Sequence, residues 1–324
     1  MMPHRSVLAG TTLALALTAT LPACAQTATQ TQVARIDRAR LLNDLGALAH
    51  DSMEGRRIGT PGGERARRFL ERRIGELGLG PVPGSAIAQP FTAAGRRGGD
   101  PVSGTNLVAM VPGTGPDTAR AIVLTAHYDH VGIRTQEAGG DSIYNGADDN
   151  ASGTAALLAL AAHLKENPLR HPVIFAWLDG EEGGLRGARA YVAEPPLPAE
   201  RMAVNVNLDM VAHAAEELYV AGTHHYPFLL PVVQSVRAQP PVKLIPGHDS
   251  GGGSDDWTGQ SDHGAFHAAG IPFLYFGVED HPDYHRPTDH VENITPAFYG
   301  AAVETILEVL LELDRQLDGV VPAR

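Results

Sequence analysis

Residues Ala121–Ala126, AIVLTA, form a short apolar run that ends directly at His127-Tyr128-Asp129. A run of this length is typical of a buried strand, and its polar end places an imidazole and a carboxylate at one edge of a sheet. Three more apolar runs lead to polar residues in the same way: Val173–Leu178 to Asp179-Gly180-Glu181-Glu182, Val204–Leu208 to Asp209, and Ile271–Gly277 to Tyr284-His285. These four runs decide the predicted fold.

Helical segments separate the runs, an order that is typical of a parallel sheet covered by helices. The expected helices are Ala151–Lys165, Leu185–Val192, Phe228–Ala238 and the closing Pro296–Leu317. We therefore predict an α/β fold with a single domain, built on a mostly parallel, mixed central sheet with helices on both faces. Ligands bind such sheets beyond the carboxyl ends of the strands, so we expect the polar residues to meet there.

The domain is expected to cover residues 37–324, because no break in composition interrupts this range. Upstream of the first run the sequence predicts two helices and two strands. The helices are Asp37–Ala49 and Glu64–Leu77, the second with Thr60 and Pro61 as its start signal, and the strands are Ala88–Ala93 and Asn106–Val111. We predict residues 25–36, rich in Thr, Gln and Ala, to be a disordered tether.

The N-terminal residues 1–24 have the pattern of a signal peptide, with Arg5 before a modest apolar stretch and small residues around Cys24. Two outcomes of export stay open. Leu21–Cys24 resembles a bacterial lipobox, in which Cys24 carries a lipid, whereas Ala23–Ala25 fits ordinary signal cleavage. Cys24 is the only cysteine, which favours lipidation. We expect an exported bacterial protein that is periplasmic, an outer-membrane lipoprotein or secreted.

The net charge of −12 excludes the basic surfaces that bind nucleic acid or anionic lipid. We therefore expect no nucleic-acid partner, and contact with a membrane only through a lipid on Cys24. No later apolar run approaches the ~20 residues of a transmembrane helix. The sequence leaves the oligomeric state open.

Gly146-Ala147-Asp148-Asp149-Asn150 opens the helix that follows the first strand. One interpretation is an acidic helix cap, and it applies best to Asp149 and Asn150. The other makes Asp148 a carboxylate that bridges two metal ions, with one oxygen on each. Both interpretations fit this position in the chain.

Glu181 and Glu182 are adjacent carboxylates at the end of a buried strand. They repel each other unless a cation lies nearby, and neighbouring side chains in a turn point in different directions. One is therefore expected to bind metal while the other holds a proton as a general base. A solvated acidic turn is the alternative.

Together the strand ends supply two nitrogen and three carboxylate donors, which suits two zinc ions that share one carboxylate. Co²⁺ or Mn²⁺ would also accept this set. The candidate metal ligands are His127, Asp148, Glu182, Asp209 and His285. We expect His263 to line the pocket without binding metal.

The order of these motifs resembles that of the secreted co-catalytic di-zinc aminopeptidase family, which includes bacterial leucyl aminopeptidases and whose clan includes glutamate carboxypeptidases and glutaminyl cyclases. The resemblance covers roughly residues 40–315. Its motifs are Glu54-Gly55-Arg56-Arg57-x-Gly59-Thr60, His127-x-Asp129, Gly146–Gly153, Asp179-Gly180-Glu181-Glu182, Asn207-Leu208-Asp209-Met210, Ser261-Asp262-His263 and Tyr284-His285-x-Pro287-x-Asp289.

The resemblance implies a zinc-dependent exopeptidase fold and a role for each matching residue. Asp148 would bridge two zinc ions, with His127 and Asp209 completing one site and Glu182 and His285 the other. Glu181 would be the catalytic base, Asp129 would orient His127, and Tyr284 would steady the oxyanion. The family also implies a cis bond between Asp148 and Asp149.

The function that follows is a metal-dependent exopeptidase, an aminopeptidase that hydrolyses N-terminal residues from peptides by means of a water bridging two zinc ions. One alternative is a glutaminyl-peptide cyclotransferase with a single zinc. The related peptidases with an inserted lid domain fit less well, because the intervals between the motifs are short. A catalytically dead ectodomain, acting as a binding module, is the third alternative.

Overall fold

An eight-stranded sheet in the order β1-β2-β6-β3-β7-β10-β8-β9 forms the centre of the fold. Its four middle strands run parallel to one another. They are β6 (Val173–Leu178), β3 (Ala121–His127), β7 (Met202–Leu208) and β10 (Phe273–Gly277), and all their residues are buried. These strands are the four apolar runs of the sequence, so the predicted parallel core of the sheet is confirmed.

The outer strands make the sheet mixed. At one edge β2 (Val102–Val111) pairs antiparallel with both β6 and β1 (Ala88–Ala93). At the other edge β8 (Glu217–Ala221) is antiparallel to β10, and β9 (Lys243–Pro246) is parallel to β8. Two short strands, β4 (Gly132–Ile133) and β5 (Ile143–Tyr144), pair outside this sheet.

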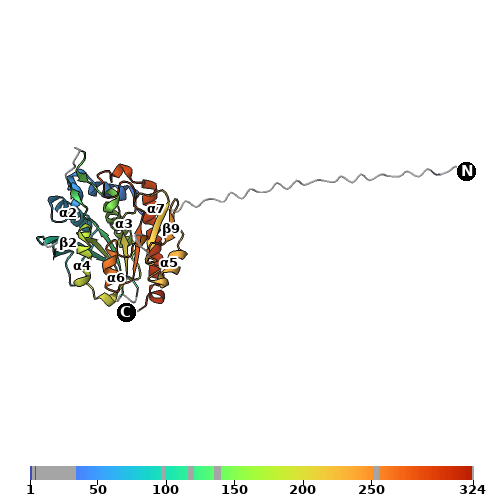
Figure 1. Cartoon of the computed structure of the whole chain (residues 1–324). Coiled ribbons are helices and arrows are strands. Elements are labelled where there is room, and N and C mark those ends of the chain that lie inside the picture. The colour runs from blue at the N-terminus through green and yellow to red at the C-terminus, as the bar shows by residue number, and fades with distance from the viewer. Residues whose placement is uncertain are drawn as a thin grey trace. The chain divides into compact units, whose positions relative to one another are not determined.

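Helices cover both faces of the sheet, as Figure 1 shows. The larger apolar cluster joins one face to five helices, and a smaller cluster joins the other face to two. The first set is α1 (Arg38–Leu48), α2 (Pro61–Glu76), α3 (Gly153–Glu166), α5 (Leu230–Ser235) and α7 (Pro296–Val320), and the second is α4 (Arg186–Ala193) and α6 (His263–Ala268). This layering matches the predicted α/β architecture.

The computed structural model describes residues 1, 4, 34–95, 99–115, 120–134, 140–251 and 255–322. Cys24, and with it the predicted signal peptide and most of the predicted tether, lies outside these residues. The end of the predicted tether belongs to the folded unit, however. Ile36 is buried in the core, and the guanidinium of Arg35 pairs with Glu304 and Glu308 of α7. Residues 35 and 36 therefore pack with the domain that was predicted to start at residue 37.

Local signals explain where several helices begin. Thr60 caps α2 by accepting a hydrogen bond from the Gly63 N–H, and Pro61 occupies the first turn, so this helix starts earlier than the predicted Glu64. Asn150 accepts a hydrogen bond from the Gly153 N–H at the start of α3. The segment predicted as one helix over Phe228–Ala238 is a 3₁₀ turn followed by the short α5.

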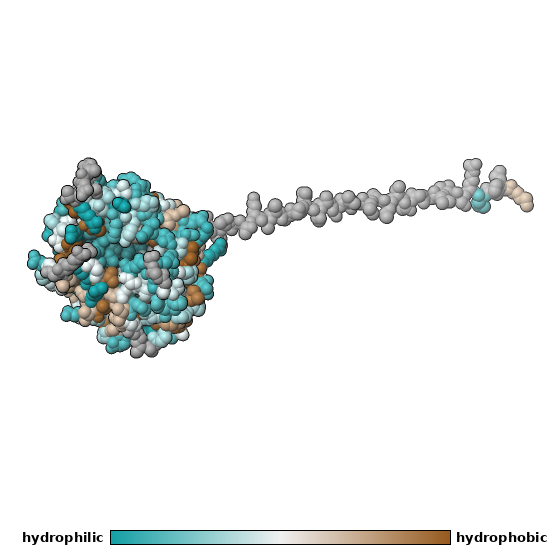
Figure 2. Space-filling view, in the orientation of Figure 1, coloured by the Kyte–Doolittle hydropathy of each residue, from teal (hydrophilic) through white to brown (hydrophobic). Residues whose placement is uncertain are grey.

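The face drawn in Figure 2 is mostly hydrophilic, with apolar residues scattered over it. Within the described part of residues 34–322, Ile133 is the one large apolar side chain that is exposed. No helix among the described residues has the length and apolar character needed to cross a bilayer.

Candidate metal centre

The candidate site lies at the carboxyl ends of the four parallel strands. His127 is the last residue of β3, Asp209 directly follows β7, and Glu181 and Glu182 form a 3₁₀ turn shortly after β6. The strands β6 and β7 flank β3 on opposite sides, so the chain changes direction across the sheet at this point. Ligands bind open α/β sheets at such a switch point.

The segment between β5 and α3 brings Asp149, and not Asp148, into the middle of this site. Asp148 points away, since its Oδ1 accepts the N–H of Ala212 at 2.7 Å and its Oδ2 lies 3.2 Å from His281 Nε2. The structure therefore places Asp149, and not the predicted Asp148, among the candidate metal donors at the strand ends. The non-proline cis bond likewise joins Asp149 to Asn150, and not Asp148 to Asp149.

Asp289 holds this segment in place. Its carboxylate accepts the backbone N–H groups of both Asp148 and Asp149, at 2.9 and 3.1 Å. These bonds fix the backbone at the two aspartates, so only the side chain of Asp149 faces the strand ends. Asp289 belongs to the motif around His285, but no role was predicted for it from the sequence.

Three donors form the first group, which we call the His127 group: His127, Asp149 and Asp209. Nε2 of His127 lies 3.3 Å from Oδ1 of Asp209 and 3.6 Å from Oδ1 of Asp149. Donors bound at about 2.0–2.1 Å to one tetrahedral zinc ion lie about 3.3 Å from each other. The spacing of the His127 group therefore fits one ion.

Four residues form the second group, the His285 group: His130, Asp149, Glu182 and His285. Nε2 of His285 lies 3.0 Å from Oδ2 of Asp149 and 3.2 Å from Oε2 of Glu182. Asp149 thus turns one oxygen toward each group. His130 was not predicted as a ligand from the sequence. Its position shortly after His127, just beyond the end of the strand, could have indicated that it lies at the same site.

The chemistry of these donors fits cations. Five oxygen or nitrogen atoms of four buried or half-buried side chains lack hydrogen-bond partners among the described residues: Asp209 Oδ1, Glu182 Oε1, Asp129 Oδ2 and both ring nitrogens of His130. Burial, and after it the nearby Glu182 carboxylate, raises the pKa of Asp149. Crowded carboxylates of this kind are costly without positive charge beside them, and divalent ions would supply it.

Glu181 differs from Glu182 in that it belongs to neither donor group. Its backbone N–H donates to Oδ1 of Asp129 at 3.0 Å, which fixes the start of the turn. Burial raises the pKa of the Glu181 carboxyl well above its usual range. A carboxylate held beside metal donors without binding metal itself is suited to proton transfer.

The contacts of Asp129 differ from those that the resemblance implies. Nδ1 of His127 lies 3.1 Å from the backbone oxygen of Asp129 but 3.7 Å from its carboxylate. The ring of His127 is thus oriented mainly through the main chain, while the carboxylate of Asp129 holds the Glu181 turn. Both contacts link the ends of β3 and β6.

Tyr284 and His263 flank the site. The ring of Tyr284 stacks on His285 with centroids 4.0 Å apart, and burial raises the pKa of its phenol. His263 is buried against Phe273 and Tyr275, and its Nε2 pairs with the Trp257 carbonyl at 2.8 Å. His263 belongs to neither of the two donor groups.

The side chain of Arg56 is fully buried and supports the backbone around the site. Its guanidinium donates to backbone carbonyls of Leu48, Tyr128 and Gly146 at 2.8–2.9 Å. It thereby joins the end of β3 to the segment that carries Asp149. Burial lowers the pKa of Arg56 to about 10, against the opposing effect of Asp149, which leaves the group charged at neutral pH.

We expect Arg56→Met to lower the free energy of unfolding by about 3–5 kcal/mol, because it removes the one buried donor group that these carbonyls share. Urea denaturation of the metal-loaded protein measures the change. Arg57→Met is the matched control, since Arg57 is the exposed neighbour, and it should stay within about 0.5 kcal/mol of the wild type. Equal losses in the two variants would contradict this role for Arg56.

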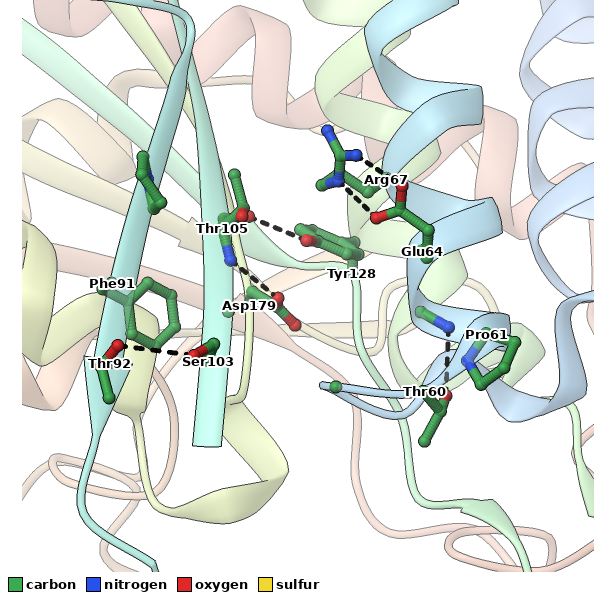
Figure 3. Close-up of a pocket in the computed structure, with 14 residues that line it drawn as sticks. Thr60, Pro61, Glu64, Arg67, Phe91, Thr92, Ser103, Thr105, Tyr128 and Asp179 are labelled. Atoms are coloured by element: carbon green, nitrogen blue, oxygen red, sulfur yellow. Dashed lines mark hydrogen bonds and ion pairs between the residues drawn. The ribbon is translucent and has the colours of Figure 1, made fainter. Parts of the chain in front are cut away.

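A cavity of about 690 Å³ lies beside the centre, between the start of α2 and the ends of β1 and β2. Figure 3 shows two hydrogen bonds that fix residues of the cavity wall. The Tyr128 hydroxyl donates to the Thr105 carbonyl, and the Thr105 N–H donates to Asp179. Burial, and after it Asp129, raises the pKa of Asp179 to about 7. Tyr128 and Asp179 adjoin the metal-donor segments, whereas the donors themselves do not line the cavity.

Comparison with known proteins agrees with this geometry. A profile described as peptidase family M28 matches residues 106–310. The aminopeptidase YwaD of Bacillus subtilis is 36% identical over 189 residues, which cover 54% of this chain and 37% of YwaD. Leucine aminopeptidase 2 of Trichophyton rubrum is 24% identical over 300 residues, 85% of this chain and 58% of that protein. The chain thus spans less than two thirds of these relatives.

Solved structures share the fold at low sequence identity. An aminopeptidase from Aneurinibacillus sp. strain AM-1 superposes with a TM-score of 0.68 at 16% identity, covering 90% of this chain and 96% of that one. A glutaminyl cyclase from Fimbriiglobus ruber superposes with a TM-score of 0.64 at 21% identity, covering 86% and 95%. Aminopeptidases and a cyclase therefore share this architecture, and the fold alone does not distinguish between the two activities.

Proposed function

Because the chain belongs to the M28 peptidase family, we propose that it is a zinc-dependent aminopeptidase that removes residues from the free N-termini of peptides. The observation that carries the proposal is the pair of donor groups that share Asp149, with Glu181 beside them. A single-zinc cyclase would need only one such group. Two groups with donor spacings that suit zinc favour two ions and hydrolysis.

The proposed ligands divide at Asp149. His127 and Asp209 would hold one ion with its Oδ1, and Glu182 and His285 would hold the other with its Oδ2. When bound, zinc lowers the pKa of a coordinated water and polarises the scissile carbonyl. Co²⁺ and Mn²⁺ remain possible substitutes in the same donors.

Glu181 is proposed as the general base and general acid, which moves a proton from the attacking water to the leaving amine. Its carboxylate takes a proton from the attacking water while the water oxygen bonds to the carbonyl carbon. The C–N bond then breaks, and Glu181 returns the proton to the leaving amine. Two features support this role: the backbone bond to Asp129 that fixes the turn, and the burial that raises the pKa of the carboxyl and so makes its carboxylate a stronger proton acceptor.

Tyr284 is proposed to donate a hydrogen bond to the oxygen of the scissile carbonyl as negative charge develops there. Its raised pKa keeps the phenol protonated, and its stacking on His285 holds it beside the His285 group. Both features support a hydroxyl donor at this position.

Export belongs to the same proposal. Cleavage directly before Cys24 would leave a protein anchored by a lipid on Cys24, whereas cleavage after Ala25 would release the protein. Peptides outside the cytoplasm would be the substrates in either case. The support for this location is the sequence of the N-terminal segment alone.

The test compares matched peptides with free and acetylated N-termini. An aminopeptidase should cleave the free peptide more than about 100-fold faster, because the site that receives the amine would reject its blocked form. Release of the N-terminal amino acid is followed by mass spectrometry, with the chelated protein as control. Equal cleavage of both peptides would contradict the aminopeptidase assignment, and cyclisation of an N-terminal glutamine without hydrolysis would indicate a cyclase.

A further inference from the structure

We propose that His130 is a fourth protein ligand of the ion held by Asp149, Glu182 and His285. The inference rests on the proposed zinc site and makes its two positions unequal. The His285 group would enclose its ion with four protein donors, whereas the His127 group would offer three and leave a position free. The position, the partners and the surroundings of the His130 ring support this role.

The position of the ring fits coordination. Nδ1 of His130 lies 2.7 Å from Oε1 of Glu182 and 3.5 Å from Oδ2 of Asp149. One donor atom from each residue of the His285 group lies within 4.8 Å of all the others. Four donors around one tetrahedral zinc ion would lie about 3.3 Å apart, which is close to these separations.

The partners of the ring also point to a metal. His130 is fully buried, and neither of its nitrogens has a hydrogen-bond partner among the described residues. Nδ1 of His130 and Oε1 of Glu182 approach each other to 2.7 Å, yet neither atom has a hydrogen-bond partner among the described residues. A buried imidazole without partners is costly, whereas an ion between these two atoms would satisfy both.

The surroundings hold the ring where it is. A Cβ atom at Gly146 would lie 2.6 Å from Cδ2 and 2.7 Å from Cγ of His130, so the glycine leaves room for the imidazole. His130 follows β3 directly behind His127-Tyr128-Asp129. The same chain segment therefore supplies a donor to each group, His127 to one and His130 to the other.

The two metal positions would differ in their number of protein donors, and this difference has a chemical consequence. Metal sites closed by protein donors are typical of ions that stay bound, and sites with three protein donors leave room for water or substrate. The three-donor His127 group would therefore be the position that accepts water or substrate.

The competing role for His130 is that of a positioning residue, whose N–H would hold Glu182 without touching metal. Loss of such a partner typically lowers metal affinity by 10–100-fold. Loss of a ligand should lower it by more than about 100-fold and also remove one metal–nitrogen bond. The two roles therefore predict different affinities and different ligand counts.

The first measurement counts histidine ligands. The protein, labelled with nitrogen-15 histidine, is stripped of metal and loaded with two equivalents of cadmium-113. Scalar coupling should mark three metal-bound histidines, His127, His130 and His285. Coupling to His127 and His285 alone would overturn the inference while leaving the proposed function intact. A wild-type protein that binds neither cadmium nor zinc would overturn both.

The second measurement is a zinc titration of His130→Gln against a competing chelator. We expect affinity at one position to fall by more than about 100-fold, with the other within about threefold. His171→Gln is the matched control, because His171 is also buried but pairs with Asp314 at the opposite end of β6. A loss in His130→Gln of about 100-fold or less would contradict coordination. The cadmium experiment decides the question independently of how this variant folds.

Discussion

Replacing Glu181 with glutamine should lower kcat for peptide hydrolysis by about 10²–10⁴-fold while zinc stays bound. The amide keeps the size of the side chain but cannot take a proton from water. Since Glu181 lies outside both donor groups, the metal content should match that of the wild type. Steady-state kinetics with a free-amine peptide and zinc analysis of the same sample measure both quantities.

Glu200→Gln serves as the control for this change, because Glu200 is an exposed glutamate in the turn before β7. It should retain full activity. Hydrolysis by Glu181→Gln within tenfold of the wild type, with zinc bound, would remove Glu181 from the reaction. Loss of zinc in the same variant would instead make Glu181 a ligand.

The second large effect is expected at Asp149 and not at the neighbouring Asp148. Asp149→Asn should lower activity on the order of 1,000-fold, because the residue faces both donor groups and the bound ions supply several kcal/mol of catalysis. Zinc content should fall below that of the wild type. Metal analysis after dialysis and kinetics at saturating zinc provide the two readouts.

Asp148→Asn is the matched control at the adjacent position. Its Oδ1 accepts the Ala212 N–H, a bond that an asparagine oxygen also makes. We expect two zinc ions and activity within about tenfold of the wild type. If Asp148→Asn lost zinc and Asp149→Asn kept it, the assignment drawn from the structure would be reversed.

This pair also shows what the sequence could predict. The acidic segment before α3 marked a candidate site, although an acidic helix cap fitted the same residues. Which aspartate faces inward depends on contacts with Asp289 and Ala212, which are distant in the chain. Sequence spacing contains no information on such long-range hydrogen bonds, so it could not show which of the two aspartates faces the strand ends.

The strands were predictable to the extent that they are buried. The central strands are uninterrupted apolar runs, and β6 and β1 have the predicted bounds. The short strands β8 and β9, at one side of the sheet, were missed, because Glu217–Ala221 and Lys243–Pro246 are partly exposed and alternate little. Their pairing is set by β10 and by each other, not by a local pattern.

The most direct test of the metal centre is an anomalous difference map from crystals of the zinc-loaded protein. We predict two zinc peaks about 3.5–4 Å apart, one on each side of the Asp149 carboxylate. The first should lie against His127 and Asp209, and the second against Glu182 and His285. A single peak, or peaks bridged by Asp148 with Asp149 turned away, would contradict the account.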